Sequence, residues 1–191
     1  MTYLKSNKAC NLRPNGGVID GMSLSMNPSR RGFLLATALA APTLALGASG
    51  LAFAAEDPYA NSPFRKVSDS EWKVRLLPAS YQVLRHEDTE PPGSDRVMLN
   101  EHRKGTFACI GCGLPLFKSE WKFESGTGWP SFYTAIPGAF IKKTDMMIGV
   151  PRTEYHCAQC LGHHGHVFPD GPKPTGLRYC NNGVALKFIP A

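Results

Sequence analysis

One short pattern occurs twice in the chain, as Thr106-Phe-Ala-Cys-Ile-Gly-Cys-Gly113 and as Thr153-Glu-Tyr-His-Cys-Ala-Gln-Cys-Leu-Gly162. In both places a run of β-forming residues leads into a Cys-x-x-Cys turn, and a glycine follows closely. Such a turn directs two thiolates toward one centre, and two such turns complete a tetrahedral Zn²⁺ site. Because a closed shell of four sulfurs leaves no position open for chemistry, we expect one structural zinc ion per chain. Its predicted ligands are Cys109, Cys112, Cys157 and Cys160.

Two other uses of these four cysteines stay open. In an exported protein they could form disulfides, with three possible connectivities, and either pair alone could be a redox couple. The 44 residues between the two pairs (113–156) exceed the gap of a compact zinc finger. That spacing still suits a zinc clamp between two hairpins, which is the preferred interpretation.

Strand and turn signals around the two pairs predict a mainly β fold of the α+β class. Short apolar and aromatic runs alternate with glycine and proline turns, as in small antiparallel sheets and unlike alternating strand–helix units. Upstream, residues 61–89 carry the strongest helix signals, because Ser68 and Glu71 have capping-box spacing and Pro78 can begin a second helix. We therefore expect N-terminal helices beside small sheets that the zinc site clamps. The expected strands are Thr106–Ile110, Leu114–Lys118, Phe140–Lys143, Met146–Val150, Thr153–His156 and Val184–Ile189.

The N-terminal segment has the features of an export signal. Residues 33–55 are nearly free of charge, and the sequence SRRGFL at residues 29–34 has the form of a twin-arginine signal. The sequence AFA at residues 52–54 offers a cleavage site. We expect residues 1–54 to be a cleaved signal peptide and residues 55–191 to form one domain, periplasmic or otherwise exported. A retained membrane anchor is the alternative, although glycines and alanines make this run a poor one. No later stretch approaches membrane length, so no stable insertion is expected after cleavage.

The net charge of +6, from 21 basic and 15 acidic residues, does not indicate a nucleic-acid partner. Residues 1–54 hold five basic side chains and one acidic one, which leaves 16 basic against 14 acidic, a net of +2, for residues 55–191. The basic excess therefore belongs mostly to the predicted signal, and we expect the folded domain to bind no nucleic acid.

Cys180 stands apart from the two cysteine pairs. Its neighbours within Leu177–Gly183 are mostly polar or aromatic, and Arg178, two residues away, would share its face on a strand. A guanidinium there favours the thiolate, which is the reactive form, so Cys180 is a candidate nucleophile. The alternative is a buried, inert cysteine.

Three histidines follow the second cysteine pair, namely His163, His164 and His166. They could bind a second metal ion, for which Asp170 is the only near carboxylate. Alternatively, the zinc clamp holds this loop so that imidazoles face Cys180. A histidine there can raise the thiolate fraction or donate a proton to a leaving oxygen. Taken alone, each histidine is more often a structural residue.

The segment Gly126-Thr-Gly-Trp-Pro-Ser-Phe132 places two large aromatic residues after a glycine turn. Trp129 and Phe132 could form an apolar wall for a small substrate group such as a methyl. The alternative is a core tryptophan after a turn.

Taken together, these segments resemble the methionine-R-sulfoxide reductases, the B type of peptide methionine sulfoxide reductase. The resemblance implies two antiparallel sheets with N-terminal helices, and thiol-dependent reduction of methionine-R-sulfoxide in oxidised peptides or proteins. That activity would repair proteins after oxidative stress. The resemblance runs from about Val67 to Pro190 and is carried, in order, by Cys109–Cys112, Phe123–Phe132, Arg152–Glu154, Cys157–Cys160, Gly165–Gly171 and Gly176–Gly183.

The resemblance also implies roles for individual residues. Cys180 matches the catalytic nucleophile, and Trp129 matches the aromatic residue that receives the substrate methyl group. The four paired cysteines match the structural zinc site of many members. The remaining matched active-site residues are His163, His166, Asn182, Asp170 and Arg178.

Three positions depart from the commonest pattern of the family. His164 stands where many members have leucine, Asn181 replaces an aliphatic residue, and Thr127 takes the position of the resolving cysteine of many members. With four cysteines on zinc and one attacking, no thiol is left to resolve the product. We therefore expect His166 or His163 to protonate the sulfoxide oxygen, and Cys180 to form a sulfenic acid that an external thiol, thioredoxin-like or other, reduces.

Two functions of other classes stay open. A zinc-clamped binding module without catalysis would use Cys180 and the histidines for packing, and it predicts an inert thiol. A thiol-dependent zinc enzyme of similar architecture, acting on small aldehyde–thiol adducts, would need a catalytic metal position and more than one zinc ion per chain.

Overall fold

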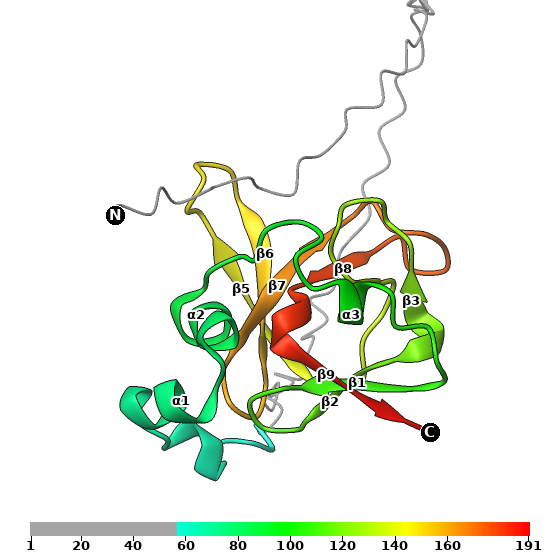
Figure 1. Cartoon of the computed structure of the whole chain (residues 1–191). Coiled ribbons are helices and arrows are strands. Elements are labelled where there is room, and N and C mark those ends of the chain that lie inside the picture. The colour runs from blue at the N-terminus through cyan, green and yellow to red at the C-terminus, as the bar shows by residue number, and fades with distance from the viewer. Residues whose placement is uncertain (1–56) are drawn as a thin grey trace, which may run out of the picture. The chain divides into compact units, whose positions relative to one another are not determined.

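The computed structural model describes residues 57–191, and the predicted signal peptide at residues 1–54 lies outside them. The described part contains two antiparallel sheets, one of three strands and one of six, with short helices at its N-terminal side (Figure 1). The predicted mainly β fold with N-terminal helices is confirmed. None of the described helices is long and apolar enough to cross a membrane.

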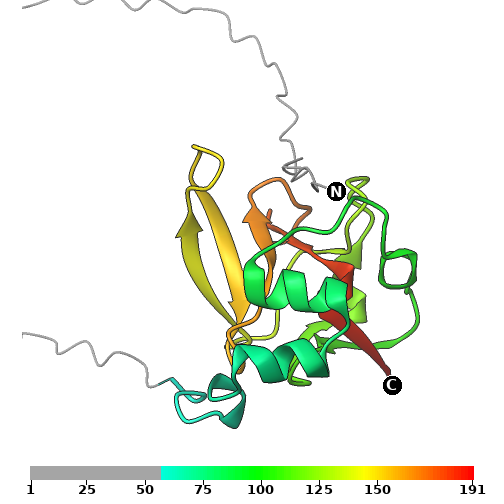
Figure 2. The ribbon, with the colours of Figure 1, turned by 60° about the vertical axis from the view of Figure 1, so that its left-hand side comes forward.

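The first helices begin where the sequence signals lie. Before α1 (Asp69–Arg75), the Ser68 hydroxyl accepts the Glu71 N–H and the Glu71 carboxylate accepts the Ser68 N–H, so the predicted capping box is present. The second helix, α2 (Pro78–His86), begins at the predicted proline. These two helices lie side by side (Figure 2). The second one, α2, packs against β7 (His163–Phe168), the strand beside that of Cys180, and against the 3-10 turn η3 (Gly183–Ala185). The remaining helical turns are η1 (Pro63–Arg65), α3 (Arg96–Leu99), η2 (Ser119–Trp121) and η3 (Gly183–Ala185).

The three-stranded sheet has the order β2-β1-β9, with both pairings antiparallel. Its first Cys-x-x-Cys turn connects β1 to β2, as expected from the strand signals on either side. The last strand begins later than predicted, because residues 183–185 form η3 before it. The strands are β1 (Gly105–Cys109), β2 (Pro115–Lys118) and β9 (Leu186–Pro190).

The six-stranded sheet has the order β3-β4-β8-β7-β6-β5, and each adjacent pair is antiparallel. The second Cys-x-x-Cys turn connects β6 to β7. The strands are β3 (Lys122–Phe123), β4 (Ser131–Phe132), β5 (Phe140–Asp145), β6 (Arg152–Cys157), β7 (His163–Phe168) and β8 (Arg178–Asn181).

Two sequence predictions about this sheet are wrong. Residues 146–150 form the turn between β5 and β6 rather than a strand. The Asp145 carboxylate accepts the Met147 N–H at 2.7 Å, and Gly149 has a φ of 77°, so the backbone closes a hairpin although its side chains are apolar. The histidine segment, expected as a loop, forms β7, because β6 and β8 pair with it on both sides.

Aromatic rings join the two sheets in one core. Phe117 of the smaller sheet stacks on Phe132 of the larger one, with ring centroids 4.0 Å apart. Phe107 meets the same Phe132 ring edge-on at 5.0 Å. Tyr155 and Tyr179 extend this cluster along the larger sheet, with ring centroids 5.4 Å apart. One face of the six-stranded sheet is thus committed to the core, which leaves the opposite face for polar residues.

Candidate functional site

The two Cys-x-x-Cys turns share one backbone hydrogen-bond pattern. In each, the N–H of the first cysteine donates to the carbonyl five residues on, and the N–H four residues on donates back to its carbonyl, at N···O distances of 2.8 to 2.9 Å. Gly113 and Leu161 hold the equivalent left-handed position, with φ of 81° and 62°. Gly162, the glycine that follows the second pair, comes one residue later. The repeated sequence pattern therefore produces a repeated turn.

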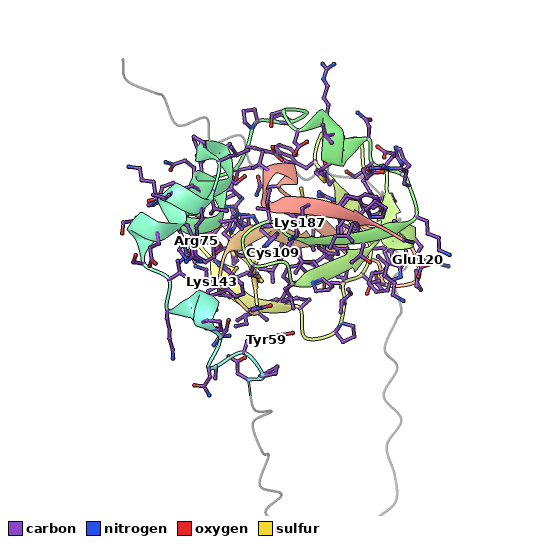
Figure 3. All side chains as sticks on the ribbon, turned by 60° about the horizontal axis from the view of Figure 1, so that its bottom comes forward. Tyr59, Arg75, Cys109, Glu120, Lys143 and Lys187 are labelled. Atoms are coloured by element: carbon purple, nitrogen blue, oxygen red, sulfur yellow. The ribbon has the colours of Figure 1, made fainter. Side chains whose placement is uncertain are left out.

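These turns bring the four predicted ligands together, with their sulfur atoms within 4.8 Å of one another. Figure 3 labels one of them, Cys109. The Sγ atoms of Cys109 and Cys160 are 3.7 Å apart, and those of Cys112 and Cys157 are 3.5 Å apart. Sulfurs at about 2.3 Å from a tetrahedral zinc ion lie about 3.8 Å from one another. The donor set and its spacing therefore fit one metal ion.

The four thiols shift one another's pKa in opposite directions. Hydrogen bonds with the other three thiols, that of Cys109 first, lower the pKa of Cys112, whereas hydrogen bonds with the same group of thiols raise the pKa of Cys109. No disulfide forms among the five cysteines of residues 57–191. The described residues thus have none of the three disulfide connectivities that spacing left open.

The candidate nucleophile lies in a row of side chains that crosses the six-stranded sheet. Cys180 on β8 is directly opposite His166 on one side and Ser131 on the other. His166 is in turn opposite Glu154, and Glu154 is opposite Lys143. Residues directly opposite each other in antiparallel strands share a face. The row therefore places the thiol and the imidazole next to each other on the polar face.

A bulge brings a second imidazole to that face. His163 and His166 are three residues apart, so a regular strand would point them to opposite faces. The register between β6 and β7 shifts at Tyr155/His156, which pairs His156 with His163. As a result the rings of His163 and His166 lie 5.6 Å apart. The two histidines expected in the active site therefore lie together, through a bulge that spacing alone does not reveal.

Each of these histidines contacts its own carboxylate. Nδ1 of His163 lies 2.5 Å from Glu154, and Nε2 of His166 lies 2.9 Å from Asp145. Burial lowers the pKa of His166, and the hydrogen bond with Asp145 only partly offsets this effect. Burial raises the pKa of Asp145, but the Met147 N–H, His166 and Arg152 outweigh it and lower that pKa.

Trp129 forms an apolar cluster with Cys180 and Phe168 on the same face. Its indole N–H donates to the Glu90 carbonyl at 3.1 Å, and the Glu90 N–H donates to the Asn182 side chain at 3.0 Å. The backbone of Glu90 thus holds both Trp129, the predicted methyl-binding residue, and Asn182. Phe132 is not brought to the site, because it is fully buried on the opposite face, against Phe117.

The buried Arg178 pairs with the exposed carboxylate of Asp170 beside the thiol. As expected, Arg178 shares the face of Cys180 on β8. Its guanidinium donates to both Asp170 oxygens at 2.9 Å and lies 4.5 Å above the Phe168 ring. Arg178 therefore also packs against Phe168, which belongs to the cluster with Trp129 and Cys180.

The three departures from the family pattern have distinct environments. His164 is fully buried on the core face, with its ring centroid 5.7 Å from that of Phe140. The buried Asn181 accepts the Tyr155 hydroxyl at 3.0 Å. Thr127 begins a chain of hydroxyls, because its Oγ1 is 2.8 Å from Ser125 Oγ, which is 2.8 Å from Oγ of Ser131, the residue opposite Cys180.

Three acidic residues of the site, Glu90, Asp145 and Glu154, were not among those predicted from the sequence. The only local signal is the alternation Arg152, Glu154, His156, which places three ionisable side chains on one face of a strand next to a cysteine pair. Their contacts with the histidines and with Trp129 depend on strand register and on loop packing.

Comparison with known proteins assigns the family. Residues 76–190 match the SelR domain. A peptide methionine sulfoxide reductase MsrB of Pseudomonas putida (strain W619) is 54% identical over 121 residues, which cover 63% of this chain and 90% of that protein. The MsrB of Bradyrhizobium diazoefficiens is 51% identical over 124 residues, with 64% and 88% covered. That of Agrobacterium fabrum is 47% identical over 130 residues, with 68% and 96% covered. The chain therefore belongs to the SelR domain family, that of the MsrB peptide methionine sulfoxide reductases.

Proposed function

We propose that the chain is a peptide-methionine (R)-S-oxide reductase with Cys180 as its nucleophile. The observation that carries this is the position of Cys180, opposite His166 in the sheet and in one cluster with Trp129 and Phe168. Imidazoles on one side and an aromatic wall on the other suit a substrate with a polar S–O bond and an apolar methyl group. The substrates are oxidised methionine residues of peptides or proteins.

The reaction transfers one oxygen atom from methionine sulfoxide to the enzyme. The Cys180 thiolate attacks the sulfoxide sulfur while His166 or His163 gives a proton to the oxygen. The sulfoxide S–O bond breaks, methionine leaves, and Cys180 becomes a sulfenic acid. The methionine sulfur gains two electrons and the Cys180 sulfur loses two, so thiol plus sulfoxide gives sulfenic acid plus thioether.

An external thiol completes the cycle. Within residues 57–191, the other four cysteines belong to the metal cluster, and Thr127 replaces the resolving cysteine of many members. One reductant thiol attacks the sulfenic acid and releases water, and a second thiol then frees Cys180 as the reductant becomes a disulfide.

The metal of the four-cysteine cluster is zinc, and its role is structural. Four thiolates suit Zn²⁺ and leave no ligand position open. The cluster takes two ligands from the β1–β2 turn and two from the β6–β7 turn. Zinc therefore ties the smaller sheet to the strand that bears the histidines.

The chain is exported by the twin-arginine route, and residues 1–54 are the cleaved signal. This proposal rests on the sequence signals alone. The twin-arginine route carries folded proteins, so zinc would bind in the reducing cytoplasm before the thiols meet an oxidising compartment.

The test is reduction of the R and S forms of a peptide methionine sulfoxide, with dithiothreitol as reductant, by the purified protein and by Cys180→Ser. We expect turnover of the R form alone, and none by the variant. A single turnover without reductant should leave a sulfenic acid on Cys180, detected by mass spectrometry of a trapped adduct. No turnover by folded, zinc-loaded protein would favour a non-catalytic binding module.

A further inference from the structure

Glu154 is a buried carboxylate at the centre of the polar face. It lies on β6 with 3% of its surface exposed, between Lys143 on β5 and His166 on β7, in the row that contains Cys180. A buried carboxylate is unfavourable unless it is paired, so its partners indicate what it does.

Glu154 uses one oxygen for two imidazoles and the other for an ammonium. Oε1 is 2.5 Å from Nδ1 of His163 and 2.8 Å from Nε2 of His156, and Oε2 is 3.3 Å from Nζ of Lys143. Burial raises the pKa of Glu154, but hydrogen bonds with His156 and His163 outweigh it and hold that pKa well below its ordinary value. An ionised carboxylate only accepts hydrogen bonds, so Nδ1 of His163 carries a proton.

The spacing of these groups suits hydrogen bonds rather than a metal ion. Two ligands bonded at about 2.0–2.1 Å to a tetrahedral metal ion lie about 3.4 Å apart. Glu154, His156 and His163 could supply three ligands, but Oε1 of Glu154 is 2.5 Å from Nδ1 of His163, where it forms a hydrogen bond, and 2.8 Å from Nε2 of His156. Both distances are shorter than the spacing of two ligands on one metal ion. The Lys143 ammonium beside the same carboxylate also opposes a second cation.

With Nδ1 engaged, Nε2 of His163 is left for chemistry. Nε2 is buried and has no hydrogen-bond partner within residues 57–191. In His166 the nitrogens are used the other way round: Nε2 contacts the carboxylate of Asp145, and Nδ1 is the nitrogen not engaged by that carboxylate. The two imidazoles therefore present different nitrogens, and a different carboxylate fixes each one.

We propose that Glu154 is a positioning residue that holds His163 with a proton on Nδ1, so that Nε2 exchanges the proton with the sulfoxide oxygen. This inference rests on the proposed function. His163 gives its Nε2 proton to the oxygen and remains a neutral ring with Nδ1–H donating to Glu154. A proton returns to Nε2 before the next turnover. Lys143 balances the charge of Glu154 and is itself paired with Glu87 at 2.5 Å.

The test compares Glu154→Gln with Glu154→Asp. Glutamine keeps the shape, but its amide can donate to Nδ1 of His163 and so favours the opposite tautomer. We expect kcat of Glu154→Gln to fall about 10²–10⁴-fold, with KM within threefold of wild type, because only the proton-transfer step is affected. Aspartate restores the charge, so kcat of Glu154→Asp should be at least about tenfold higher than kcat of Glu154→Gln.

Glu87→Gln is the matched control, because it makes the same chemical change on the outer partner of Lys143. Its kcat should stay within twofold of wild type. Nitrogen-15 NMR of the histidines, assigned with His163→Asn, should show a proton on Nδ1 of His163 in wild type and its movement to Nε2 in Glu154→Gln. That readout does not depend on turnover.

Two results would overturn the inference. A folded Glu154→Gln with kcat within threefold of wild type overturns the inference, and so does a wild-type His163 protonated on Nε2 alone. If Glu154→Gln does not fold, the activity of Glu154→Asp and the wild-type spectrum decide. Wild-type and Glu87→Gln proteins that are folded but inactive would instead overturn the proposed function.

Discussion

Three histidines within four residues have three different environments. His163 and His166 lie on the polar face, where carboxylates from neighbouring strands hold them. His164 points into the core, and within residues 57–191 neither of its ring nitrogens has a hydrogen-bond partner. A buried imidazole without hydrogen bonds destabilises the fold, because water would have satisfied both nitrogens in the unfolded chain. The residue identity is the same in all three cases, so strand geometry alone separates the two proposed catalytic histidines from the core one.

At this scale we predict that His164→Leu stabilises the protein by about 1 kcal/mol at pH 7 and leaves R-sulfoxide reduction unchanged. Leucine fills a similar volume without unbonded nitrogens. Urea unfolding monitored by tryptophan fluorescence measures the difference, and His86→Leu, on an exposed residue, is the control. A destabilised or inactive His164→Leu would show that this imidazole does have a role.

The pH dependence of the same residue gives a second prediction. Burial lowers the pKa of His164 from 6.5 to about 3, so the unfolded chain takes up a proton as pH falls below 6.5 while the folded one does not. This histidine therefore removes stability as pH falls from 6.5 toward 3, by up to about 1.4 kcal/mol per pH unit. The advantage of His164→Leu should grow by about 2 kcal/mol between pH 6.5 and 5. An advantage that stays constant over this interval contradicts the assignment.

At the scale of elements, the bulge in β7 makes the site. It turns His163 to the face of His166, and Gly165 between them allows β7 to approach β8 closely. A Cβ on Gly165 would lie 2.0 Å from the Cys180 carbonyl oxygen, and φ there is 153°. The glycine is needed because the backbone of β8 occupies the space of a side chain.

We predict that Gly165→Ala abolishes activity and strongly reduces the yield of folded protein. The control is Gly138→Ala, which also changes a glycine with positive φ, 74°, but with nothing within 4 Å of the new Cβ. It should cost only about 1 kcal/mol and keep its activity. Thermal unfolding and R-sulfoxide turnover of both variants separate the clash from backbone strain. Equal behaviour of the two variants would mean that close strand approach is not the constraint.

The second Cys-x-x-Cys turn carries a leucine where the first has glycine. Leu161 has a φ of 62° and an exposed side chain, so it contributes strain and little packing. We predict that Leu161→Gly stabilises the protein by about 0.5–1 kcal/mol, whereas Gly113→Ala destabilises it by a similar amount. Urea midpoints measure both. If Leu161→Gly and Gly113→Ala both stabilise the protein, or if neither does, the two turns are not equivalent.

Elements with local signals could be predicted, and those that depend on pairing could not. Each of the predicted signals depends on residues that are close together in the sequence. These signals are the capping box of α1, the proline that begins α2 and the two cysteine turns. The segment His-His-Gly-His of β7 has weak strand propensity, and only its partners on both sides make it a strand. Residues 146–150 have a strand-like composition, but the hairpin turns there. Glu154 and Asp145 reach the histidines through a register that no local pattern encodes.

At the scale of the whole molecule, two contacts join the sheets: the aromatic core and the cysteine cluster. Phe107, Phe117 and Phe132 provide the first, and the sulfurs of the β1–β2 and β6–β7 turns provide the second. The zinc prediction could be made from sequence because its ligands lie in two local motifs. Without a metal, four thiols at 3.5 to 3.7 Å would lie close together with little to hold them, since thiols are weak hydrogen-bond partners.

We predict that zinc is required for the fold rather than for the reaction itself. The purified protein should contain one zinc ion per chain by elemental analysis. Removal by a strong chelator, under reducing conditions so that no disulfide forms, should lower Tm or unfold the chain, because metal binding and folding are coupled. Activity and structure should then be lost together, and both should return when zinc is restored. Cys112→Ser should weaken zinc binding without touching the Cys180 row. A zinc-free protein that keeps its Tm and still reduces the R-sulfoxide would contradict the clamp, and a second zinc ion needed for turnover would indicate a catalytic metal.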